Sequence, residues 1–215
     1  MTPQLDIRAY EPRDRDPVRR ICFETGYMGE PIAWQWRDGE SFADLATGYY
    51  TDREPESTLV AERDGRVVGY LTGCADSERS RGVAGQQVRQ LLGRGALLRP
   101  GLAGVFWRSL FDLLRDRQAP DEFLADPRWP AHLHINLLPE GRRCGLGRRL
   151  VTGWLDRLRA AGSPGVHLGT FAENTNAIPF FEACGFHRHG GPARVPGLRT
   201  REGRRMHVQW MIRSL

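Results

Sequence analysis

Short stretches of alternating or continuous apolar residues along the chain predict β-strands. Six stretches have this pattern: residues 5–10, 57–62, 66–75, 131–138, 166–171 and 204–212. Asp64-Gly65, a dipeptide typical of tight hairpin turns, separates the second stretch from the third. A loop rich in arginine and glycine is expected before the last strand.

Between these stretches, apolar residues recur every three or four positions, which predicts amphipathic helices. The predicted helices cover residues 14–26, 41–50, 146–161 and 176–184. Ser41 is a good N-cap for the second of them. Because strands and helices alternate after antiparallel hairpins at the start, the chain is predicted to form an α/β fold, with an α+β mixed sheet.

The composition is typical of an ordinary globular protein. Of the 215 residues, 40% are hydrophobic and 27% are charged, and a chain of this length can bury a sizeable core. No apolar run approaches the length of a membrane span, and residues 1–4 lack the basic and apolar regions of a signal peptide. We therefore expect a cytoplasmic protein with no membrane partner.

The formal net charge of +5 comes entirely from arginine, because the chain contains no lysine. This excludes chemistry that needs a P-loop lysine or a Schiff-base lysine. The arginines are interleaved with acidic residues, which argues against a nucleic-acid partner. Four cysteines lie far apart without metal-ligand spacing and are expected to be free thiols: Cys22, Cys74, Cys144 and Cys184.

The most informative stretch is Arg142-Arg143-Cys144-Gly145-Leu146-Gly147, a turn between a predicted strand and a predicted helix. A helix N-terminus presents unpaired N–H groups and the positive end of a dipole, which together favour an anion. The two glycines let the backbone approach a bulky diphosphate closely. A phosphorylated cofactor also suits the local arginine cluster, which consists of Arg142, Arg143, Arg148 and Arg149.

The turn reads Arg-x-x-Gly-x-Gly and resembles the pyrophosphate-binding loop of the GNAT superfamily of N-acetyltransferases. Residues 174–186 resemble the family's stretch Asn-x-x-Ala-x-x-hydrophobic-Tyr-x-x-x-Gly-Phe, with Asn174, Ala177, Gly185 and Phe186 at matching positions. Residues 132–139 and the second motif are also similar to the acetyltransferase-like domain of O-GlcNAcases and its bacterial relatives.

The resemblance implies one GNAT-like domain over residues 1–215, with residues 78–130 as an insertion outside the minimal family pattern. Two helical stretches are expected in the insertion, near residues 83–92 and 105–115. The insertion either shapes the acceptor cleft or forms the surface of a homodimer.

The resemblance also implies that acetyl-CoA is the cofactor. In the family, the helix of the second motif and its Asn meet the pantetheine and acetyl end. Backbone amides at the end of the preceding strand hold the pantetheine and polarise the thioester carbonyl. The implied cofactor-binding residues are Leu137, Leu138, Arg142, Arg143, Cys144, Gly145, Leu146, Gly147, Arg148, Asn174, Ala177 and Phe181.

Phe181 departs from the family pattern, which commonly has a tyrosine there as the general acid for the departing CoA thiolate. Phenylalanine has no proton to donate. Either another group or solvent protonates the thiolate, or the domain binds acetyl-CoA without efficient turnover.

The strand predicted over residues 131–138 carries His132, His134 and Asn136 on one face and apolar residues on the other. A strand buried on both faces should be apolar throughout, so the polar face predicts a cleft. His134 is a candidate general base, and Asn136 would orient the acceptor or a water. His132 fits a histidine bonded inside the packed interior equally well. Glu173, after the next strand, is either a second candidate base or a solvated loop carboxylate.

The resemblance implies direct acetyl transfer from acetyl-CoA to an amine, either a small molecule or a peptide, without an acyl-enzyme. The alternative is an inactive module that binds acetyl-CoA or a protein partner. Phe181 favours the module, whereas His134 and Glu173 favour the enzyme. Trp34 and Trp36 either pack in the core or form an acceptor wall.

Overall fold

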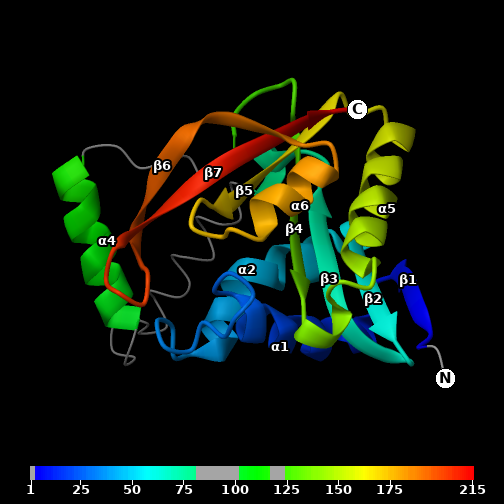
Figure 1. Cartoon of the computed structure of the whole chain (residues 1–215), viewed down its shortest axis with the longest axis horizontal. Helices are drawn as coiled ribbons and strands as arrows, with labels where there is room; N and C mark the ends of the chain where they lie inside the picture. Colours follow the sequence, from blue (N-terminus) through cyan, green and yellow to red (C-terminus); the bar gives the residue numbers. More distant parts are fainter. Residues whose placement is uncertain (1–2, 81–101, 117–123) are drawn as a thin grey trace.

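A computed structural model describes residues 3–80, 102–116 and 124–215, which form a seven-stranded sheet flanked by helices (Figure 1). The strand order is β1-β2-β3-β4-β5-β7-β6. The strands are β1 (Leu5–Ala9), β2 (Thr58–Arg63), β3 (Arg66–Cys74), β4 (Ala131–Leu137), β5 (Gly165–Phe171), β6 (His187–Arg199) and β7 (Arg205–Ser214). The helices are α1 (Arg15–Thr25), α2 (Gly39–Arg53), α4 (Leu102–Asp116), α5 (Leu146–Ala160) and α6 (Ala177–Ala183).

The sheet is mixed, as predicted. Neighbouring strands are antiparallel except β4 and β5, which are parallel. Asp64 and Gly65 both have positive φ in the turn between β2 and β3, which is the backbone conformation that an Asp-Gly hairpin provides.

Helices cover both faces of the sheet. On one face, Val18 and Ile21 of α1 pack with Val60 and Tyr70 of the sheet. On the other face, α5 and α6 bury their apolar sides in the main core, which contains Leu150, Trp154, Leu158, Ile178 and Phe181. Among the described residues, no helix is long and apolar enough to cross a membrane.

The predicted strands and helices in the described part of the chain are confirmed, with two differences. Helix α2 begins before Ser41, because Asp38 is its N-cap and accepts the Ser41 N–H at 3.4 Å. The loop expected before the last strand contains β6, which pairs with β7 through two register shifts. The glycines and prolines of β6 interrupt the alternating pattern by which a strand is predicted, and β6 forms because it pairs with β7.

The predicted insertion is described only in part. Its second predicted helix is confirmed as α4, whereas the helix predicted over residues 83–92 lies outside the described residues. Figure 1 shows α4 beside β6, at the end of the molecule opposite β1. The domain boundaries and the status of residues 78–130 as an insertion stay predictions.

Candidate active site

The turn between β4 and α5 places free backbone donors at a helix N-terminus. Gly145 is the N-cap of α5 with φ 88°, a region that favours glycine, and a Cβ there would meet no atom within 4 Å. The Arg149 N–H donates to Gly145 O at 3.1 Å. In the described part of the chain, the amides of Leu146, Gly147 and Arg148 have no backbone partner. These donors can hold an oxyanion.

The other residues of the turn divide between structural and exposed positions. A Cβ on Gly147 would lie 3.1 Å from Leu137 and 3.3 Å from Phe180, so close packing requires this glycine. Arg142 donates to Leu137 O at 2.8 Å and to Gly29 O at 2.6 Å, which ties the turn to β4 and to the loop after α1. Arg143 and Arg148 are exposed.

Strands β4 and β5 part after only two paired positions, Ala131 with Val166 and His132 with His167. The Leu138 N–H donates to Val68 O of β3 at 2.8 Å. Because backbone groups along a strand point alternately to its two neighbours, the amides of Ile135 and Leu137 point away from β3. This unpaired edge of β4, residues 134–137, is referred to below as the seam. It ends at the turn before α5.

His132 lies in the packed interior. It is 1% exposed, and its Nδ1 and Nε2 atoms each lie 2.7 Å from a hydroxyl, of Ser77 and Tyr50 respectively. Since Ser77 donates its own proton to Pro130 O, His132 Nδ1 donates to Ser77 and Nε2 accepts from Tyr50. Burial and the neighbouring histidines hold the pKa of His132 well below its usual value. The interior interpretation of this residue therefore fits its surroundings.

His134 differs from its neighbour although both lie on the same face of β4. Its ring centroid lies 5.6 Å from those of Tyr50 and His132, and the side chain is exposed. No hydrogen bond joins its imidazole to another described residue. The dense protein around the ring disfavours its charged form and, with His167, lowers the pKa of His134 to about 4. It is therefore an unprotonated imidazole, open to solvent at neutral pH.

Asn136 fastens β4 to its neighbours. Its Nδ2 donates to Thr25 Oγ1 at 2.6 Å, and its Oδ1 accepts from Tyr70 OH at 3.2 Å. These bonds connect β4 to the end of α1 and to β3. The role of Asn136 in orienting an acceptor stays a prediction.

Glu173 forms a pair with His207, a residue that the sequence analysis missed. The carboxylate accepts the His207 N–H at 3.1 Å and the Nδ1–H at 2.9 Å. Burial acts to raise the pKa of Glu173, but the bonds from His207 outweigh it and the pKa is lowered. His207 lies on β7, which comes beside β5 only in the folded sheet, so no local pattern could reveal the pair.

The second motif forms the start and the buried side of α6. Asn174 Oδ1 accepts the Ala177 N–H at 3.1 Å and so orders the first turn of the helix. Phe181 is buried against Phe186, with 5.8 Å between ring centroids. The half-buried Phe180 ring lies beside Gly147 in the turn between β4 and α5. This turn, residues 142–147, is called the cofactor turn below.

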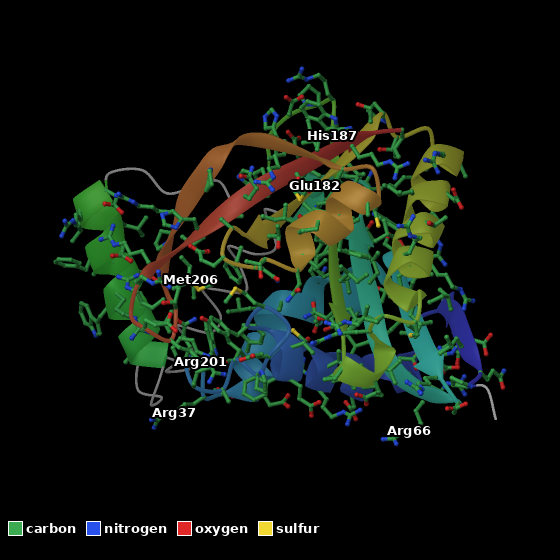
Figure 2. The ribbon with its side chains drawn as sticks, in the orientation of Figure 1. Arg37, Arg66, Glu182, His187, Arg201 and Met206 are labelled. Carbon is green, nitrogen blue, oxygen red and sulfur yellow. The ribbon has the colours of Figure 1, made fainter. Side chains whose placement is uncertain are left out.

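The two tryptophans have different surroundings, and the acceptor wall stays a prediction. Trp36 packs on Phe42 in an apolar cluster and donates to Ser41 Oγ at 2.9 Å. Trp34 is 41% exposed and lines a cavity of about 610 Å³. This cavity lies between the loop after α1, helix α4 and the β6–β7 hairpin; Figure 2 shows Arg37 and Arg201, two of its lining residues, at one corner of the molecule. No group of potential metal ligands is present among the described residues.

Comparison with known proteins agrees with this geometry. The chain matches the Acetyltransferase (GNAT) family model over residues 26–186. It is similar to the crystal structure of SsHAT, with 25% identity, 98% of both chains covered and a TM-score of 0.65. It is also similar to yncA from Salmonella typhimurium, solved with its cofactor acetyl-CoA, with 17% identity, 98% and 94% of the two chains covered and a TM-score of 0.57.

A ribosomal-protein-alanine N-acetyltransferase from Brucella melitensis has the same fold, with 18% identity, 98% and 99% of the two chains covered and a TM-score of 0.57. The residues matched by the family model include the cofactor turn, the seam, His134 and Glu173. The chain therefore belongs to the GNAT family of acetyltransferases.

Proposed function

We propose that the protein transfers the acetyl group of acetyl-CoA directly to an amine, either a small molecule or a peptide. The observation that carries the proposal is the continuity of the seam with the cofactor turn. Unpaired amides of β4 lead directly to unpaired amides of α5. An extended arm along the seam and a diphosphate at the helix N-terminus would use both sets of donors.

The residues of this region fit the cofactor. Gly145 leaves open space in front of the α5 amides, and exposed Arg143 and Arg148 add positive charge. When bound, acetyl-CoA would supply a thioester whose carbonyl an amine can attack; the C–S bond breaks, and CoA leaves as a thiolate that solvent can protonate. Since the Leu138 amide is engaged by β3, the Leu137 N–H is the donor that we assign to the carbonyl oxygen.

We assign the proton from the amine to His134. Its imidazole is exposed, neutral at pH 7 and free of hydrogen bonds to other described residues, so its lone pair is open to a proton. Glu173 is a second acceptor, but its carboxylate is already engaged by the two N–H groups of His207. In this arrangement Glu173 holds His207 in one orientation through Nδ1.

The alternative is a module that binds acetyl-CoA without turnover, and Phe181 favours it. The core encloses this ring, and a phenyl group has no proton for a thiolate. Retained cofactor binding without transfer to any amine would establish the module. The cytoplasmic location, the relation to O-GlcNAcases and the homodimer stay predictions. Helix α4 exposes the apolar residues Trp107, Phe111 and Leu114, which such a homodimer would bury.

The cofactor assignment is tested by replacing Gly145 with leucine and measuring acetyl-CoA affinity by calorimetry. Gly162 is the matched control, because it also has positive φ and an open Cβ position but lies at the far end of α5. Both variants carry similar backbone strain, about 1–2 kcal/mol. We expect Gly145→Leu to weaken binding at least tenfold, about 1.4 kcal/mol, and Gly162→Leu to leave it unchanged. Unchanged affinity in both variants would remove the cofactor from this turn.

A further inference from the structure

The cavity beside α4, called the arginine pocket here, is lined by four arginines and by no acidic residue in the described part of the chain. Its volume of about 610 Å³ is in the range of small-molecule sites. Its lining arginines are Arg37, Arg108, Arg199 and Arg201. They come from the loop after α1, from α4 and from the β6–β7 hairpin, so only the folded chain brings them together.

Among the described residues, two of these guanidinium groups have no acidic partner. Arg199 is neutralised by Asp112, at 2.7 Å, and Arg201 by Glu30, at 2.8 Å. Arg108 donates its Nε–H to the neutral Gly197 O at 3.2 Å. Within the described ranges, neither Arg108 nor Arg37 has a carboxylate partner. The pocket therefore attracts anions.

Gln35, one of the residues that line the pocket, carries a buried donor without a partner among the described residues. Its side chain is 5% exposed, and its Oε1 accepts the Arg199 N–H at 2.9 Å. This bond fixes the amide orientation, because the flipped amide would point a donor at a donor. Its Nε2 has no hydrogen-bond partner among the described residues. A buried unpaired donor costs about 1–3 kcal/mol, which a ligand oxygen would offset.

We propose that the arginine pocket binds an acidic ligand through an oxyanion, a carboxylate or a phosphate. Arg37 and Arg108 supply the charge, and Gln35 supplies the neutral donor. Trp34, packed edge-on against Tyr27 at 5.0 Å, forms an apolar wall for the rest of the ligand.

The position of the pocket indicates which molecule carries the oxyanion. This assignment rests on the proposed acetyl transfer. Tyr27 contacts Trp34 and shares one apolar cluster with Met206 and with Phe171, the last residue of β5. One apolar cluster therefore extends from the wall of the pocket to the end of β5, two residues before Glu173. We therefore assign the acidic group to the amine acceptor.

Binding is tested on the full chain without acetyl-CoA, using succinate and inorganic phosphate as probes. A nuclear magnetic resonance titration follows the Gln35 side-chain NH₂ and the Trp34 indole N–H. We expect saturable shifts, and at least fivefold weaker binding in Arg37→Gln and Arg108→Gln. The control is Arg66→Gln, an exposed arginine that Figure 2 shows at the other end of the molecule.

Gln35→Glu sharpens the test, because it keeps an acceptor for the Arg199 N–H but replaces the free donor with a negative oxygen. This variant is expected to fold but to bind neither succinate nor inorganic phosphate. Failure of both probes to bind the parent, or equal binding by the parent and the pocket variants, would overturn the site. Stronger binding of one probe decides between carboxylate and phosphate.

A separate experiment tests whether the acidic group belongs to the amine acceptor. β-Alanine and phosphoethanolamine are compared with β-alaninamide and ethanolamine as acceptors, with acetyl-CoA present. We expect kcat/KM for the acidic amines alone to fall at least fivefold in Arg37→Gln. Probe binding without acetylation of any amine supports the pocket and removes the proposed function. Acetylation of acidic amines at equal rates by the parent and Arg37→Gln overturns the acceptor assignment.

Discussion

At the scale of single residues, the surroundings of a side chain decide its chemistry more than its type does. His132 and His134 are two positions apart on one face of β4. The first uses both ring nitrogens in bonds to Ser77 and Tyr50, so it has no free site for a substrate proton. The second has an imidazole that is exposed and neutral at pH 7.

His134→Gln is therefore expected to lower acetyl transfer at least tenfold while acetyl-CoA affinity stays within a few-fold. A positioned base contributes on the order of a hundredfold or more. The control is His187→Gln, which removes an exposed histidine from β6. Steady-state kinetics and calorimetry separate the two effects. Since the pKa of His134 is about 4, protonation should remove its contribution only as the pH falls through that value.

Equal transfer rates in the parent and His134→Gln would assign the proton to another group, with Glu173 as the next candidate. If the parent transfers acetyl to no amine but binds acetyl-CoA, the binding module is the better description.

At the scale of elements, a buried carboxylate attaches α4 to the β6–β7 hairpin. Asp112 is 2% exposed and accepts from Arg199, Arg205 and the Gly197 N–H. The hydrogen bond from Arg199 is the largest cause that lowers the pKa of Asp112 to about 2. The same contacts hold Arg199 in the wall of the arginine pocket.

We expect Asp112→Asn to lower the free energy of unfolding by on the order of 3 kcal/mol, because it leaves the partly buried Arg199 without its charge partner and removes one of the two carboxylates that bind Arg205. Chemical denaturation measures this. In the control, Glu182→Gln, the lost pair with Arg188 is exposed and should cost less than about 1 kcal/mol. The Asp112 contribution should be complete above pH 4 and disappear as the pH falls toward 2. Similar decreases in the free energy of unfolding of the two variants would contradict the role of Asp112 in attaching α4 to the β6–β7 hairpin.

Sequence patterns predicted the elements whose residues are apolar at regular spacing, and they missed what depends on distant pairing. The strand β4, helix α5 and the cofactor turn are local, so periodicity and two glycines located them. Strand β6 has no such period and exists through β7. The Glu173–His207 pair and the arginine pocket join segments that meet only in the folded sheet.

At the scale of the whole molecule, stability is expected to rise between pH 5 and pH 7. Unfolded His132 binds a proton below about pH 6.5, whereas the folded protein keeps this residue neutral, so the unfolded chain holds more protons. One such histidine contributes up to about 1.4 kcal/mol per pH unit. The lowered pKa of His134 acts in the same direction down to about pH 4.

Denaturation at pH 5, 6 and 7 measures this slope. His132→Gln should flatten it, and His187→Gln should keep it. If His132→Gln does not fold, the parent profile still decides, because a parent stability that stays constant over this range would contradict the buried neutral histidine.

The seam also has a consequence for the lifetime of the protein. In the described part of the chain, the backbone ladder between β1–β4 and the other three strands has only two pairs of residues, Ala131–Val166 and His132–His167. A cofactor lying along the unpaired edge would supply donors and acceptors where the ladder has none. Its binding free energy would then oppose local opening of the sheet, by an amount that grows with the logarithm of its concentration. If acetyl-CoA binds as proposed above, its supply would therefore slow the proteolysis of this chain.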